Sequence, residues 1–307
     1  ILCLVTDLTL WLSIFSLQVW VYFLPIFTLS ASKGLQDMKN SRLKYKLIAY
    51  SMVLSIILPL LLIIIWSFAN RWQWPSLVPT DYGLRGWSYI FGARAKTFEI
   101  ICISMCISFI ASIITVGITI PAAKAMAHYN FKFKKQIEML IFLPAIVPTV
   151  VVAMGIHIHF LRMNLGGSFS GLVLINILPC IPYSYWILKN VFEIIGDKMN
   201  YQARVLGASS TQTFVYITLP MIFPGIITAI SMSFIVSFGQ YFINVLIGAG
   251  KITTFTMLMF PYIESGDRTM GSVYGTVFLF ASLIGLVIVE KLTSSMYRGK
   301  LKEYKYV

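Results

Sequence analysis

Long stretches without a charged side chain constrain this chain more than any other feature. Each of six stretches has at least 18 residues, enough for a helix to cross the hydrocarbon core of a bilayer. They are Leu47–Phe68, Ile100–Ala123, Met139–Leu161, Phe169–Leu188, Met221–Gly250 and Thr269–Val289. Only 11% of the 307 residues are charged, whereas 58% are hydrophobic and the mean hydropathy is +0.82. One soluble core could not bury that much apolar surface, which excludes a secreted enzyme, a disordered tail and a DNA-binding domain.

A seventh apolar stretch, Leu8–Ser32, precedes these six. It either spans the membrane, lies along its interface, or belongs to the upstream half of a longer chain. The sequence therefore predicts an all-α polytopic membrane protein with a six-helix core and one extra N-terminal hydrophobic helix. We expect three parts. Residues 1–46 hold the extra segment and a basic linker, residues 47–292 the six-span domain, and residues 293–307 a basic tail.

The basic residues indicate the orientation of the core. Of the 24 Lys and Arg residues, 17 lie in the connectors on one side of the six core stretches and in the tail. Connectors on the cytoplasmic side of a membrane carry such an excess, so both ends of the core are expected in the cytoplasm. The net charge of +13 then reflects contact with membrane lipid and not with nucleic acid.

The connector 189–220 is too long and too patterned for a simple turn. Tyr201–Leu206 reads as a short helix, and Gly207 can adopt the left-handed conformation that ends a helix. Ser209 stands three residues before Gln212, which is the capping-box spacing that starts a second helix. That helix is expected to end at Pro220. Two interpretations remain open: an amphipathic elbow that touches only lipid, or a docking helix for a cytoplasmic partner.

The same connector resembles a loop of the permease subunits of ATP-binding-cassette (ABC) importers of type I. In that family the loop reads E-A-A, three residues, Gly, nine residues, I-x-L-P. Here Tyr201-Gln202-Ala203, Gly207 and Ile217-Thr218-Leu219-Pro220 keep the spacing, but Tyr201 and Gln202 replace the acid and the first alanine. Three further segments are similar to the family: Gly117–Ala127, the two pairs Leu143-Pro144 and Val147-Pro148, and Pro182-Tyr183.

This resemblance implies a permease subunit that forms half of a translocation pore in the bacterial cytoplasmic (inner) membrane. Its partners would be cytoplasmic ABC ATPase subunits, a second permease that is related but not identical, and an extracytoplasmic solute-binding protein. The chain lacks the phosphate-binding sequence G-x-x-x-x-G-K-[ST], so no cofactor is expected here, and ATP and Mg would bind the partner ATPase. The resemblance assigns ATPase coupling to Ala203, Leu206, Gly207, Ala208, Ser209, Phe214, Ile217, Leu219 and Pro220.

Four polar residues in the fifth core stretch form a candidate translocation path. At 100° per residue, Ser233, Ser237, Gln240 and Asn244 stay within about 60° of one another on a continuous helix. Such a face meets either a hydrated cavity or another helix. Asn176 is expected to hydrogen-bond between helices. His157 and His159 lie on different helix faces, and the four cysteines have no ligand partners at metal-binding spacing, so no metal site is expected.

Two other classes of function compete with the importer permease. A solitary secondary transporter or channel would show internal repeats and charges in the middle of its spans, and a membrane enzyme would show a convergent catalytic set. None of these is present in the sequence. The transported solute is expected to be small and polar. The stretch Trp74–Pro79 slightly favours a polyamine-like solute over iron(III), thiamine, a phosphonate or an oxyanion.

Overall fold

The structure is a computed structural model that describes residues 42–72, 79, 81–92 and 96–304. The extra N-terminal segment 1–32 and the basic linker up to residue 41 lie outside the described residues. The chain divides into two compact units, Ile1–Leu62 and Ile63–Val307. The described part of the first unit belongs to one helix, α2 (Arg42–Trp66), whose last residues enter the second unit.

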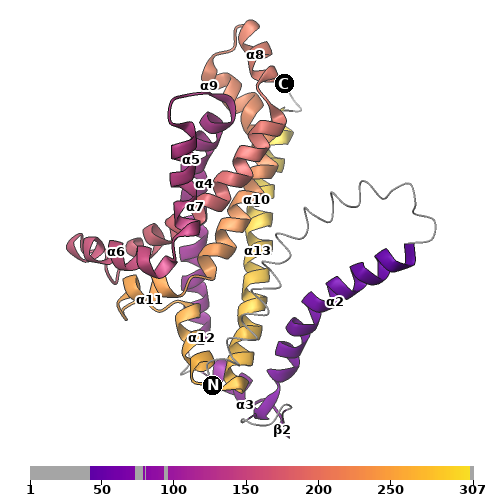
Figure 1. Cartoon of the computed structure of the whole chain (residues 1–307), viewed down its shortest axis with the longest axis vertical. Helices are drawn as coiled ribbons and strands as arrows, with labels where there is room; N and C mark the ends of the chain where they lie inside the picture. The colour runs from indigo at the N-terminus through magenta and orange to yellow at the C-terminus, as the bar shows by residue number, and fades with distance from the viewer. Residues whose placement is uncertain (1–41, 73–78, 80, 93–95, 305–307) are drawn as a thin grey trace. The chain divides into compact units, whose positions relative to one another are not determined.

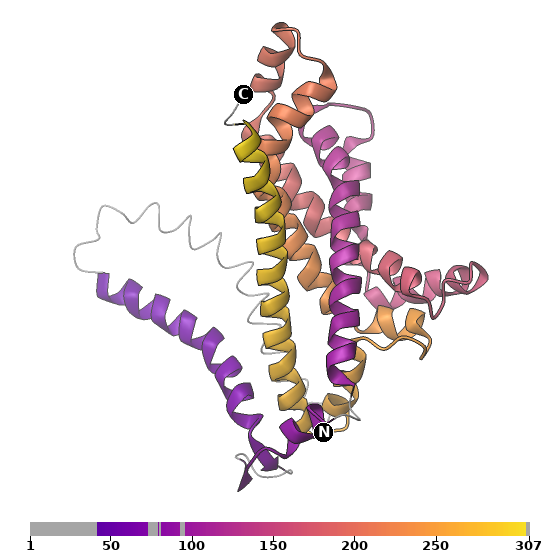
Figure 2. The same ribbon diagram turned by 180° about the vertical axis from the view of Figure 1, so that it is seen from behind.

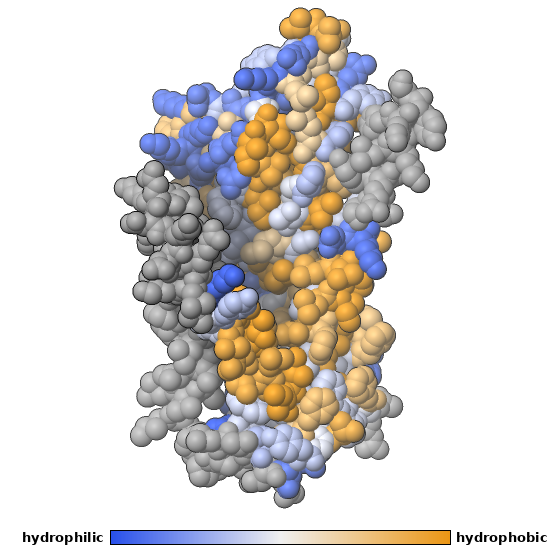
Figure 3. Space-filling view, turned by 90° about the vertical axis from the view of Figure 1, so that its right-hand side faces the viewer, coloured by the Kyte–Doolittle hydropathy of each residue, from blue (hydrophilic) through white to orange (hydrophobic). Residues whose placement is uncertain are grey.

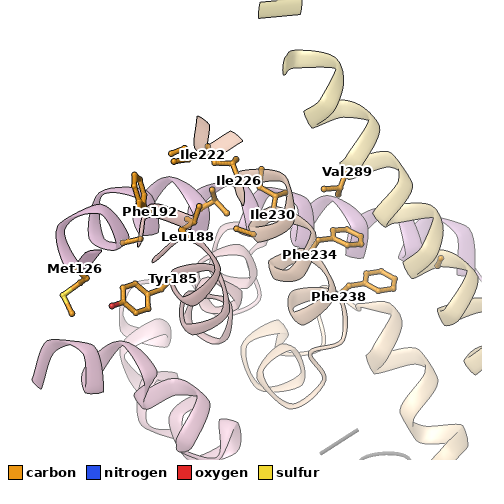
Figure 4. Packing of buried hydrophobic residues seen from close by; sticks show 14 residues of the cluster. Met126, Tyr185, Leu188, Phe192, Ile222, Ile226, Ile230, Phe234, Phe238 and Val289 are labelled. Carbon is orange, nitrogen blue, oxygen red and sulfur yellow. The ribbon is translucent and has the colours of Figure 1, made fainter. Parts of the chain in front are cut away.

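Four long helices form the framework of the second unit: α4 (Thr97–His128), α7 (Phe169–Ile195), α10 (Leu219–Phe238) and α13 (Arg268–Tyr304). Helices α4, α7 and α10 pack against one another, and α13 lies along α10 (Figures 1 and 2). Apolar side chains from α4, α7, α10 and α13 build the largest core cluster, in which Tyr185, Leu188 and Phe192 meet Ile222, Ile226 and Ile230 (Figure 4).

Small polar residues let α4 pack closely against its neighbours. Ser104, Ser112, Thr115 and Thr119 are buried, and each hydroxyl donates to a carbonyl three or four residues earlier on α4. The Thr119 hydroxyl also lies 2.6 Å from that of Ser184 on α7. Short side chains bring helix backbones together, and their hydroxyls are satisfied without water.

The predicted span Met139–Leu161 is not one straight helix. It consists of α5 (Lys134–Ile146) and α6 (Thr149–Arg162), which are bent by 99° at Val147-Pro148. Proline lacks an N–H and disfavours helical geometry in the residue before it, so Val147 is extended (φ −77°, ψ 133°). Counting this bent pair as one span, the described residues contain six helical segments able to cross a membrane, and five without it.

The predicted continuous helix Met221–Gly250 is also broken. Helix α10 ends at Phe238, and α11 (Phe242–Gly248) begins after Gly239, Gln240 and Tyr241. The Gln240 carbonyl, which has no partner in the helix ladder, accepts from Asn244 Nδ2 at 2.8 Å and from Thr256 Oγ1 at 2.7 Å. The carbonyl at the break is therefore hydrogen-bonded, because α11 and α12 (Phe255–Glu264) each supply a side-chain donor.

The smaller elements lie at one end of the second unit, opposite the connector between α7 and α10 (Figure 1). Strands β1 (Ala69–Arg71) and β2 (Asp81–Tyr82) pair antiparallel, and the short helix α3 (Arg85–Ile90) follows them. Figure 3 shows that apolar residues cover much of the middle of one face of the molecule. Exposed apolar faces on membrane-spanning helices are covered by lipid or by other subunits.

The contact between α7 and α10 yields a stability prediction. A Cβ on Gly225 would lie 2.7 Å from Val191 Cγ2, so in Gly225→Ala either the Val191 side chain or the helices α7 and α10 must shift. We expect the free energy of unfolding to fall by about 1–3 kcal/mol. The melting temperature in detergent measures this. Gly117→Ala on α4 is the control, because its added methyl meets nothing within 4 Å and should not lower the melting temperature.

Candidate functional site

The connector 189–220 forms a helical hairpin at one end of the second unit (Figure 1). Helix α7 ends at Ile195, the following Gly196, with a φ of +66°, turns the chain, and α8 (Lys198–Val205) follows. The helix predicted over Tyr201–Leu206 is thus present and begins three residues earlier than expected. Two helices of the core, α7 and α10, flank the hairpin directly, so any displacement of the hairpin acts on both.

The turn after α8 is a Schellman motif built on Gly207. The Ala208 amide donates to the Ala203 carbonyl and the Gly207 amide to the Arg204 carbonyl, each at 3.0 Å. Gly207 has a φ of +90°, a conformation that side chains with a Cβ rarely adopt. These two bonds satisfy carbonyls at the end of α8 and fix the direction in which the chain leaves it.

The second half of the hairpin starts with the predicted capping box. Ser209 Oγ accepts from the Gln212 amide at 3.2 Å, and Gln212 Oε1 accepts from the Ser209 amide at 2.8 Å. Helix α9 (Ser210–Thr213) is followed by a π-helical turn, Phe214–Thr218, which runs directly into α10.

The expectation that this helix ends at Pro220 is wrong. Residues Ser210–Phe238 form one continuous helical segment, in which the Leu219 amide bonds to the Phe214 carbonyl, five residues earlier. The wider π-turn accommodates Pro220, which lacks an N–H and would clash with a carbonyl of a regular α-helix. The hairpin is therefore joined rigidly to α10 and not through a flexible proline exit.

Side chains tie the two arms of the hairpin together and fix them to the core. Arg204 Nη2 donates to Ser210 Oγ at 2.8 Å, and Thr218 Oγ1 donates to Asn200 Oδ1 at 2.9 Å. The Lys124 ammonium of α4 lies 5.2 Å from the centre of the Phe214 ring, a cation–π contact. These contacts fix the hairpin to the adjoining ends of α4 and α10.

The hairpin presents apolar residues at its tip. Val205 and Leu206 are each 88% exposed, and Tyr201 and Tyr216 are also exposed. An open hollow beside them is lined by Leu206, Gly207, Ala208, Gln212, Thr213, Tyr216 and Ile217. Exposed bulky apolar side chains next to an apolar hollow are typical of a surface that a protein partner covers.

The assigned coupling residues divide into three groups by exposure. Leu206, Gly207 and Ser209 are exposed at the turn, whereas Ala203 is buried against the hairpin. Ala208, Phe214, Ile217, Leu219 and Pro220 are partly buried. The sequence assignment did not include Val205 and Tyr216, which are more exposed than most of the assigned residues. The sequence signal that could have identified Val205 is the run of two bulky apolar residues, Val205 and Leu206, directly before Gly207.

The predicted polar stripe does not form one helix face, because the chain breaks between Phe238 and Phe242. Ser233, Ser237 and Asn244 are buried within this subunit, and only Gln240 is partly exposed. Asn244 Oδ1 accepts from Asn176 Nδ2 at 2.7 Å, so Asn176 hydrogen-bonds between helices α7 and α11 as expected. In the described residues, no group of three or more His, Cys, Asp or Glu side chains could hold a metal ion.

Comparison with known proteins identifies the family. The model of the binding-protein-dependent transport system inner membrane component matches residues 113–296, more than half of the chain. The chain belongs to this family of ABC importer permeases. It is therefore a multi-pass inner-membrane permease and not itself an ATPase, and ATP binds a partner subunit. Membership in this family sets aside the solitary transporter or channel.

Several relatives of this permease are assigned to the transport of named solutes. The chain is 22% identical over 241 residues to PhnV of Salmonella typhimurium, provisionally named a 2-aminoethylphosphonate transport system permease, covering 78% of this chain and 89% of PhnV. It is 26% identical over 215 residues to the molybdenum transport permease ModB of Haemophilus influenzae, covering 64% of this chain and 93% of ModB.

A solved structure supports the fold of this permease. The structure is that of a bacterial alginate ABC transporter in complex with an alginate-bound periplasmic protein. The TM-score is 0.59 at 13% identity, and the match covers 85% of this chain and 97% of the matched one. This structural likeness covers more of the chain than the family model, which matches residues 113–296.

The Schellman turn yields a prediction for the hairpin. Gly207→Val places a β-branched side chain at a φ of +90°, which costs about 1–3 kcal/mol, so the turn should open more often. Amide hydrogen exchange across residues 203–209 should accelerate. Gly207→Asn is the matched control, because asparagine tolerates positive φ better and should exchange more slowly than the valine variant. Equal exchange in Gly207→Val and the unmodified protein would contradict this account of the turn.

Proposed function

We propose that this chain forms half of the translocation pore of an ATP-driven importer and that the hairpin 189–220 couples ATPase closure to alternating access. The observation that carries the proposal is the exposed pair Val205 and Leu206 at the tip of a hydrogen-bonded hairpin. A surface of this kind suits a groove on a cytoplasmic ABC ATPase. The interpretation as a lipid-touching elbow explains less well why the arms are tied together.

The mechanism follows from the stiffness of the hairpin. When the ATPase subunits close on ATP, they displace the tip of the hairpin. Because α9, the π-turn and α10 are continuous, α10 follows the tip instead of absorbing the displacement. The contacts of α10 with α4 and α7 then carry the movement into the core, and the pore changes from inward-open to outward-open.

We infer that the complete transporter contains a second, related but non-identical permease and an extracytoplasmic solute-binding protein. The solved alginate transporter was seen in complex with a periplasmic protein, which is consistent with the latter. Tyr201 and Gln202, which replace the acid and alanine of the family loop, favour a non-identical partner that supplies the acid. In this arrangement residues 47–292 are the six-span domain, and the hairpin and C-terminal tail face the cytoplasm of a bacterium.

We further propose that the solute is a small oxyanion or a phosphonate. The supporting observation is that relatives of this chain are named for 2-aminoethylphosphonate, molybdenum and sulfate transport. The polyamine-like alternative depends on the stretch Trp74–Pro79, most of which lies outside the described residues. Along the path, the partly exposed Gln240 at the helix break is better placed to meet solute than the buried Ser233, Ser237 and Asn244.

Replacing Leu206 by aspartate tests the docking surface. The change puts a charge where an apolar contact is expected, and we predict that the amount of co-purifying ATPase falls about tenfold or more. Leu84→Asp is the matched control, because Leu84 is an exposed leucine at the opposite end of the second unit and should leave the ATPase bound. Retention of the ATPase by Leu206→Asp, or equal loss in both variants, would contradict docking at the hairpin tip.

The binding protein that co-purifies with the transporter tests the solute class. We expect 2-aminoethylphosphonate, molybdate or sulfate to raise its melting temperature, because a bound ligand stabilises the folded state by mass action. Spermidine is the matched cationic probe and should leave the melting temperature unchanged. A shift with spermidine and none with the anions would return the polyamine-like solute to first place.

A further inference from the structure

An ion pair joins α5 to the end of α7, beside the coupling hairpin. Glu138 on α5 and Lys189 on α7 form a salt bridge between Glu138 Oε1 and Lys189 Nζ. Their side chains are only 28% and 19% exposed. The hydroxyl of the buried Tyr185 donates to the same carboxylate oxygen at 3.2 Å. Glu138 directly precedes the charge-free stretch Met139–Leu161 and Lys189 directly follows Phe169–Leu188, so the pair joins the two helices where these stretches begin and end.

The pair contributes more to alignment than to stability. Withdrawing two charges from water costs free energy that their attraction roughly offsets, whereas removing one partner leaves an uncompensated charge. The geometry therefore favours one register of α5 against α7. The Phe142 ring of α5 packs edge-on against the Tyr185 ring, with 5.8 Å between the ring centres, and reinforces the same contact.

The position of the pair links the hairpin to the bent span. Lys189 lies six residues before the end of α7, which leads directly into the hairpin. Glu138 lies in the first half of α5, which reaches the 99° bend at Val147-Pro148 and continues as α6. Helix α6 packs against α11, the helix that follows the break at Gln240. A displacement of α7 can thus pass through α5 and α6 to α11.

We propose that Glu138 and Lys189 are positioning residues that make α5 move with α7 during the ATP-driven cycle. Without the pair, α7 moves, but α5 and α6, which form the bent span, do not follow it. The inference depends on the proposed function, because the hairpin supplies the displacement. Two other charges face the pair: Glu193 Oε1 lies 3.7 Å from Lys189 Nζ, and Lys134 acts electrostatically on Glu138. A charge swap would place like charges beside both, so single variants are more informative.

The test uses the complete complex with its ATPase, reconstituted in lipid nanodiscs. Spin labels replace the exposed residues Met154 on α6 and Val287 on α13, in a chain whose native cysteines are replaced. The distance between the labels is measured without nucleotide and with MgATP and vanadate. With the Glu138–Lys189 pair intact, we expect a clear change in the distance between the two labels. Glu138→Gln, which retains an acceptor for Tyr185, should lower the fraction of molecules that change about fivefold, while ATP hydrolysis continues.

Two matched variants separate positioning from simple stabilisation. Lys189→Arg keeps the charge and should keep the distance change. Glu193→Gln removes the exposed partner of Lys189 on the same helix, leaves α5 untouched and should also keep it. A normal distance change in Glu138→Gln, an equal loss in Glu193→Gln, or failure of Glu138→Gln to assemble with the ATPase would overturn the proposal. If the unmodified complex hydrolyses no ATP, the proposed function fails and this inference fails with it.

Discussion

The packing of α7 against α10 and α4 is the contact on which the rest of the structure depends. Tyr185, Leu188 and Phe192 of α7 meet Ile222, Ile226 and Ile230 of α10 along a continuous apolar seam (Figure 4). Because these two helices also flank the hairpin 189–220, the seam holds both its ends at a fixed separation. The hairpin can therefore be stiff without a large core of its own.

Backbone groups that lose their helical partner decide where the helices of this protein bend, break or continue. At Val147-Pro148 the missing N–H produces a sharp bend, whereas at Pro220 a π-turn absorbs the proline and the helix continues. At Gln240 the freed carbonyl is bound by two side chains. In a lipid environment each such group needs a partner within the protein, so the surroundings of a proline decide whether a helix bends, stops or continues.

Sequence alone predicted the elements whose determinants are local. The apolar stretches, the capping box at Ser209 and Gln212 and the left-handed Gly207 all depend on residues within a few positions, and the structure contains them. The bend within Met139–Leu161 and the break within Met221–Gly250 were missed, because periodicity cannot show whether a proline is tolerated or a carbonyl is satisfied from α12. The Glu138–Lys189 pair was also missed, since it joins residues 51 positions apart.

Contact between the hairpin tip and the ATPase is the central claim, and a photoreactive amino acid at position 206 measures it most directly. The chain is expressed in its native cell, irradiated, and the product at position 206 is identified by mass spectrometry. The account predicts a cross-link from position 206 to an ABC ATPase subunit, with a cross-linker at the exposed position 84 giving none. Cross-linking of position 206 to lipid alone would contradict the account, because the hairpin would then be an interfacial elbow and not a coupling element.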